Sequence, residues 1–168
     1  MIGKILSLSA ALFLAGVSLS ADGVADARVA KQLDRLSIAY TTTSESNYSI
    51  DKDMDGGRTQ TVYIMSKTES YGDLEIREIW SNAGNFPADP TADQMKQLLD
   101  DTSSEKIGAW NIEASDNGSV LAYFSIKVPG YLRDKDLADM IDFAATVADA
   151  MKAKLFGAET SEASQPSD

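Results

Sequence analysis

The sequence contains neither cysteine nor histidine. Without cysteine, the chain has no disulfide, no thiol nucleophile, no zinc–thiolate site and no lipid-bearing cysteine anchor. Without histidine, it has no Ser-His-Asp triad, no imidazole base and no histidine-ligated metal. These two absences exclude many common enzyme chemistries, so the sequence predicts a protein that is not an enzyme.

Basic residues are also scarce. The chain of 168 residues has 15 Lys and Arg against 26 Asp and Glu, which gives a net charge of −11. A partner with a phosphate backbone requires a basic surface, so we expect no nucleic-acid partner. Hydrophobic residues make up 43% of the chain, which is sufficient for the core of one domain.

The first twenty residues, Met1–Ser20, have the pattern of a secretory signal peptide. Lys4 supplies the positive start, an apolar run follows, and the small residues Ser18 and Ser20 precede a cleavage site before Ala21. A transmembrane anchor is the alternative, but it needs about 20 apolar residues, and this run is shorter. We therefore expect a periplasmic or secreted protein whose mature chain has no membrane anchor.

Apolar spacing predicts a single domain over residues 21–157, followed by a disordered acidic tail over residues 158–168. The expected elements are a helix in Val24–Ala39, strands at Asn47–Ile50, Thr59–Ser66 and Leu74–Ser81, a helix capped by Thr91 and Gln94, strands at Ile107–Ser115 and Val120–Val128, and a helix from Asp134 to Leu155. Short turns join the strands. This order, α-β-β-β-α-β-β-α, favours the α+β class, with an antiparallel five-stranded sheet and three helices on one face.

Two segments carry a resemblance to a known family. The strand pair WNIEASDNGSVLAYFSIKVP (Trp110–Pro129) and the helix DKDLADMIDFAATVADAMKAKL (Asp134–Leu155) resemble the YbjN-like family of bacterial proteins, within the type III secretion chaperone-like fold. The leading helix and the segment Tyr48–Ile64 fit more loosely. The resemblance spans Val24 to Leu155 and implies a non-enzymatic, often dimeric domain that binds peptides or partner proteins.

One acidic segment matches half of a calcium loop. Asp51, Asp53 and Asp55, followed by Gly56, place three carboxylates at alternate positions, as calcium-binding loops do. The glutamate expected at the last loop position is replaced by Val62. The alternative is a solvated acidic turn without a metal, in which Asp and Gly supply turn chemistry.

The aromatic residues of the predicted strands are candidates for a binding surface. Helices on one face of a sheet leave the other face open, and aromatic side chains there can bind a partner. The candidates are Trp80, Trp110, Tyr123, Tyr63 and Tyr71. For Trp110 the alternative is a place in the core, because it alternates in phase with Ile112.

The last helix has an unusually wide apolar stripe. Phe143 lies off the centre of that stripe, next to the small residues Ala145 and Ala148. An apolar side chain at a helix flank is a surface that a second subunit can cover. We therefore expect a homodimer through Phe143.

Carboxylates that are close in sequence are common but lack an enzymatic context. A glycosidase needs a cleft and one carboxyl group with a raised pKa, and the sequence shows neither. The pairs are Asp100/Asp101, Asp73/Glu75 and Glu159/Glu162. The sequence thus favours an exported binding or chaperone-like domain with a peptide or protein partner and no cofactor. The alternatives are a calcium-binding domain and a carboxylate-dependent hydrolase.

Overall fold

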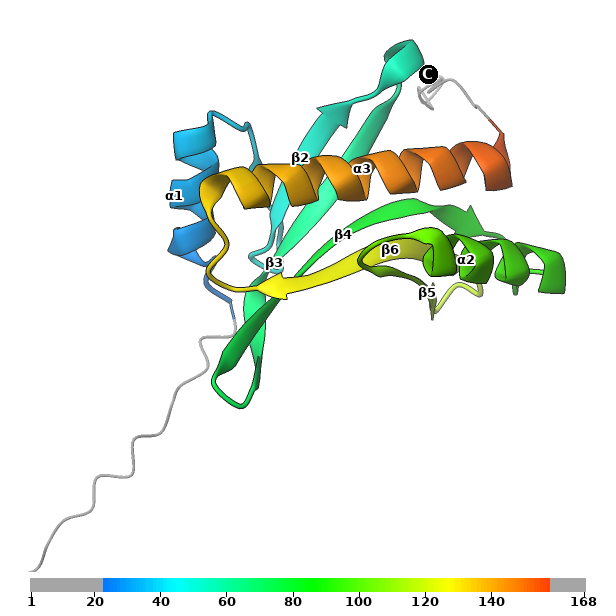
Figure 1. Cartoon of the computed structure of the whole chain (residues 1–168). Coiled ribbons are helices and arrows are strands. Elements are labelled where there is room, and N and C mark those ends of the chain that lie inside the picture. The colour runs from blue at the N-terminus through cyan, green and yellow to red at the C-terminus, as the bar shows by residue number, and fades with distance from the viewer. Residues whose placement is uncertain (1–22, 158–168) are drawn as a thin grey trace, which may run out of the picture.

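A six-stranded antiparallel sheet with the strand order β1-β2-β3-β4-β6-β5 forms the centre of the structure (Figure 1). The structure, a computed structural model, describes residues 23–157. The predicted signal peptide over residues 1–20 and the predicted tail over residues 158–168 lie outside that range. The elements are α1 (Ala27–Leu36), β1 (Thr41–Thr42), β2 (Tyr48–Asp53), the 3₁₀ turn η1 (Asp55–Gly57), β3 (Thr59–Tyr71), β4 (Leu74–Phe86), α2 (Ala92–Ser104), β5 (Ala109–Ala114), β6 (Val120–Pro129) and α3 (Asp134–Phe156).

The α+β class with three α-helices agrees with the sequence prediction, but the five-stranded sheet was wrong. The sixth strand is β1, which pairs Thr41 with Ser49 and Thr42 with Tyr48 at the edge of the sheet. Both of its residues are exposed, so it has no apolar alternation that a sequence pattern could reveal.

Strands β3 and β4 are longer than predicted because each contains an irregularity that conceals its continuation. In β3, the register shifts between Ile64 and Thr68, where three residues lie opposite Glu78 alone. In β4, the register shifts between Asn82 and Gly84, and Gly84 has a φ of 142°. The sequence predicted that this strand ends at Ser81, but the bulge lets it continue to Phe86.

All three helices lie on one face of the sheet (Figure 1). The long helix α3 crosses β3, β4 and β6, α1 packs against the first turns of α3, and α2 packs beside β5. Small buried residues on α3, such as Ala144 and Ala148, let it lie close to the sheet. None of the helices within residues 23–157 has the length and apolarity needed to cross a membrane.

The core lies between the helices and the alternate strand residues that face them. Phe124 of β6 is fully buried at its centre and contacts both Trp110 and Phe143. The predicted alternation in β6 is confirmed, since these five side chains are all buried: Val120, Ala122, Phe124, Ile126 and Val128. The opposite face of the sheet carries half-buried and exposed side chains, and it holds the candidate site.

Candidate functional site

Three aromatic side chains form a row on the sheet face that the helices leave open. Tyr63 of β3 pairs directly with Trp80 of β4, and their rings stack with centroids 4.3 Å apart at an interplanar angle of 20°. Tyr123 of β6 meets Trp80 edge-on, with centroids 5.5 Å apart. Alternate residues of a strand share a face, so all three rings are out of phase with the core residues beside them. The three half-buried rings give this face of the sheet an aromatic surface.

A hollow of about 230 Å³ opens beside this row. It is smaller than the roughly 300–1,000 Å³ of pockets that take drug-sized ligands. Its lining residues are Met65, Glu78, Trp80, Glu113, Leu121 and Tyr123. Since they come from β3, β4, β5 and β6, the hollow exists only when these four strands are in register. A pocket of this size suits one inserted side chain rather than a large cofactor.

Carboxylates give the hollow a negative character. Burial raises the pKa of the Tyr123 phenol, and the charges of Glu78 and Glu113 raise that pKa further. Lys127 offsets part of this charge, because its ammonium lies 3.8 Å from Glu78 and 3.4 Å from Glu69. Glu113 is exposed on β5 and takes part in none of the ion pairs within residues 23–157.

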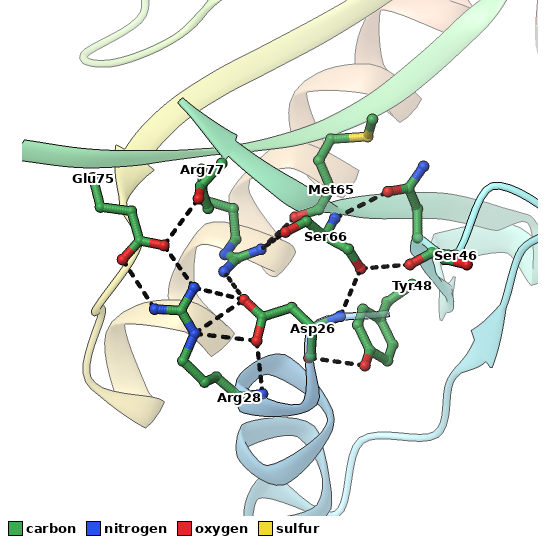
Figure 2. A network of polar contacts seen from close by, with 10 residues as sticks. Asp26, Arg28, Ser46, Tyr48, Met65, Ser66, Glu75 and Arg77 are labelled. Carbon is green, nitrogen blue, oxygen red and sulfur yellow. Dashed lines mark hydrogen bonds and ion pairs between the residues drawn. The ribbon is translucent and has the colours of Figure 1, made fainter. Parts of the chain in front are cut away.

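Met65 reaches the hollow because the irregular part of β3, between Ile64 and Thr68, is held in place by a side chain on the helix-covered face of the sheet. The indole N–H of Trp80 donates a hydrogen bond to the Met65 sulfur over 3.3 Å. The guanidinium of the buried Arg77 donates hydrogen bonds to the carbonyl oxygens of Met65 and Ser66 (Figure 2). Arg77 thus fixes the irregular backbone from the helix side, and Met65 packs against Trp80 on the open side.

Arg77 belongs to a closed network of ion pairs between α1 and the sheet. It pairs with Asp26, the N-cap residue of α1, and Asp26 also binds Arg28 (Figure 2). Arg28 in turn donates two hydrogen bonds to Glu75 of β4. No buried side-chain nitrogen or oxygen lacks a partner within residues 23–157, so the network is complete in itself. The network therefore holds the start of α1 against β4.

The network holds its carboxylates in the charged form. Burial raises the pKa of Asp26, but hydrogen bonds from Arg28 and Arg77 outweigh burial and lower that pKa from 3.8 to about 2. The hydrogen bond from Arg28 is the main cause that lowers the pKa of Glu75 from 4.5 to about 2, against an opposing contribution from burial. Both groups bind a proton more readily in the unfolded chain than in the folded one.

The free energy of unfolding is therefore expected to fall as the pH is lowered from about 4.5 to about 2. A carboxyl group with a lowered folded pKa stabilises the fold above its unfolded pKa and loses this effect as the pH approaches its folded pKa. Asp26 alone accounts for about 2 kcal/mol of the loss. Urea unfolding at several pH values checks this. Asp26→Asn keeps the helix cap and should have a shallower pH dependence than the wild type, whereas parallel curves would contradict the assignment.

The predicted aromatic residues separate between the two faces. Trp80, Tyr123 and Tyr63 lie together on the open face, whereas Tyr71 is exposed at the end of β3, away from them. Trp110 faces the helices with 9% of its surface exposed, and its indole N–H donates to Asp101. The core alternative is the one that the structure favours for Trp110.

Phe143 also lies on the helix side of the sheet. Its half-buried ring meets Phe124 edge-on with centroids 5.9 Å apart. The neighbouring Ala145 and Ala148 are buried within the same chain. Much of the surface that we expected a second subunit to cover is thus covered by the chain itself.

The three aspartates of the calcium-like segment lie on two elements. Asp51 and Asp53 are exposed on β2, and Asp55 begins η1. Asp51 accepts a hydrogen bond from the Thr61 hydroxyl. Within residues 23–157, no group of three or more acidic residues has an arrangement suited to a metal ion. The carboxylates do not converge in this structure.

Within residues 23–157, members of the predicted carboxylate pairs bind other partners. Asp100 forms an ion pair with Lys96, and Asp101 binds Trp110 and Lys154. Glu75 belongs to the Arg28 network, apart from Asp73. Glu159 and Glu162 lie outside the described residues.

Sequence reasoning missed five residues that shape the site. Arg77 could have been found, because in LEIREIWS it alternates in phase with Ile79 and Ser81, which marks it as facing the core. The other four depend on the register between strands, which no local pattern supplies: Met65, Glu78, Glu113 and Leu121.

Comparisons with known proteins concern the fold. No protein-family model matches the chain, and no curated protein matches it in sequence. Among solved structures, the arrangement is similar to that of YbjN from E. coli, with a TM-score of 0.49 and 8% sequence identity. The match covers 76% of this chain and 88% of that one. The likeness concerns a YbjN-like fold alone.

Proposed function

We propose that this chain is an exported, non-enzymatic binding domain that takes a peptide or protein partner on the open face of its sheet. The observation that carries the proposal is the row Tyr63–Trp80–Tyr123, placed where no helix of the described chain covers it. Large aromatic side chains beside a hollow are typical of the anchor points of protein interfaces. The signal-like sequence Met1–Ser20 supports export.

The shape of the open face suits an extended segment. A second, smaller hollow of about 100 Å³ adjoins the first and shares Met65 and Glu78 with it. Lys67 and Lys127 line its other side, so apolar, acidic and basic groups follow one another across the sheet. A peptide of several residues could contact both hollows at once, whereas a compact metabolite could fill only one.

Selection from a random peptide display library on the domain tests the proposal. We expect selected peptides to lose at least about thirtyfold in affinity on Trp80→Ala, which corresponds to about 2 kcal/mol for an interface anchor. Leu121→Ala is a milder change in the same hollow and should weaken the same peptides. Circular dichroism and thermal melting establish that both variants fold.

Trp110→Phe is the matched control, because Trp110 lies on the opposite, helix-covered face. It should leave peptide affinity within about twofold. A selection that yields no peptide, or only peptides indifferent to Trp80→Ala and Leu121→Ala, would overturn the proposed function.

A further inference from the structure

The hollow combines an aromatic wall, an aliphatic wall and two carboxylates. Trp80 and Tyr123 provide the aromatic surface, and Leu121 and Met65 the apolar remainder. Glu78 and Glu113 both act electrostatically on the Tyr123 phenol, so they border the same space. No single hydrophobic ligand would use the carboxylates, and no anion would tolerate them.

Positive charge on a partly apolar stem satisfies all of these groups together. A cation is attracted to the electron-rich faces of aromatic rings, with tryptophan the strongest partner. The methylene stem of a long basic side chain packs on apolar residues while its charged end stays near water and carboxylates. The net charge of −11 further favours the approach of a basic partner.

We infer that the Trp80–Tyr123 hollow binds an arginine side chain of a peptide partner. This inference rests on the proposed function and specifies the chemistry of that partner. Arginine fits better than lysine, because a planar guanidinium can stack on an aromatic ring and bind carboxylates at the same time. Glu113 is the principal counter-charge, since Glu78 already lies near Lys127.

The experiment uses Trp80 as its own reporter. The chain has two tryptophans, so in a Trp110→Phe background all indole fluorescence comes from Trp80. The probe is the capped peptide Gly-Ala-Arg-Ala-Gly, and its partner probe carries citrulline, the uncharged analogue, in place of arginine. We expect a saturable change of Trp80 fluorescence with the arginine peptide, at least about fivefold tighter than with the citrulline peptide.

Charge substitutions at matched positions distinguish the site from the general negative field of the protein. Glu113→Gln should weaken the arginine peptide by about fivefold. Asp53→Asn removes the same charge from an exposed position two strands away from Trp80 and should change affinity by less than about twofold. Equal weakening by both variants would mean a non-specific field and would overturn the inference.

Two further outcomes would also overturn it. One is equal binding of the arginine and citrulline peptides, and the other is a lysine peptide that binds as tightly as the arginine peptide. These results are distinguishable from a failure of the proposed function. Selected peptides that depend on Trp80 but carry no arginine would leave the binding domain intact and remove only the arginine assignment.

Discussion

Arg77→Met is expected to lower the free energy of unfolding by about 3 kcal/mol or more, a large share of the stability of a domain. The substitution leaves the carboxylate of Asp26, with only 13% of its side chain exposed, short of one of its two cationic partners. It also removes the hydrogen-bond donors of the Met65 and Ser66 carbonyls in the irregular part of β3. The Asp26 carboxylate and these two carbonyl groups are partly buried, and the loss of a hydrogen-bond partner by such groups is costly.

Urea unfolding measures this loss, and Arg28→Met provides the matched control. Arg28 binds the same Asp26 and also Glu75, but 56% of its side chain is exposed, so its loss should cost less than the loss of the buried Arg77. Arg77→Lys should give an intermediate loss, because an ammonium keeps the charge but not the forked geometry. If Arg28→Met and Arg77→Met destabilise equally, burial is not what makes Arg77 important.

Gly108→Ala is expected to destabilise the domain by about 3 kcal/mol, through two separate effects. The backbone of Gly108 has a φ of 85°, a value that residues with a side chain rarely adopt. A Cβ atom there would also lie 2.7 Å from the carbonyl oxygen of Ser125 and 2.6 Å from the Phe124 ring. The Phe124 ring is fully buried and has no room to move away.

Gly118→Ala isolates the first effect. Gly118 has nearly the same φ, 84°, but a Cβ atom there meets nothing within 4 Å. Its substitution should cost about 1 kcal/mol from backbone strain alone. The difference in unfolding free energy between the two variants measures the close approach at Gly108. Equal losses would show that β5 moves away from β6 without resistance.

Local sequence patterns predicted well those elements in which the spacing of apolar residues is regular from end to end. The alternation of β6, the apolar stripe of α3 and the capping box of Thr91 and Gln94 all appear as expected. The failures are at β1, which buries nothing, and at Gly84, where one extra residue reverses the phase of β4. A period of two cannot be followed through a position where it changes phase.

The site was less accessible to sequence reasoning for a related reason. Alternation within each strand predicts that Trp80 and Tyr123 point away from the core. Only the pairing of β4 with β6 brings the two rings into contact with each other. The alternation of LEIREIWS marks Arg77 as facing the core. Only its pairing with Asp26, which lies 51 residues earlier in the chain, explains how a charged side chain is accommodated there.

The strand order also has a consequence for the course of folding. Strands β1 to β4 follow one another as neighbours, so their contacts close over short stretches of chain. The pairing of β4 with β6 is different, because α2 and β5 lie between them in the sequence and a long loop must close before the pairing forms. Trp80 and Tyr123 stand on opposite sides of that seam. We therefore expect the hollow to be among the last regions to assemble, and a nascent chain to complete the aromatic row only after β6 has been synthesised.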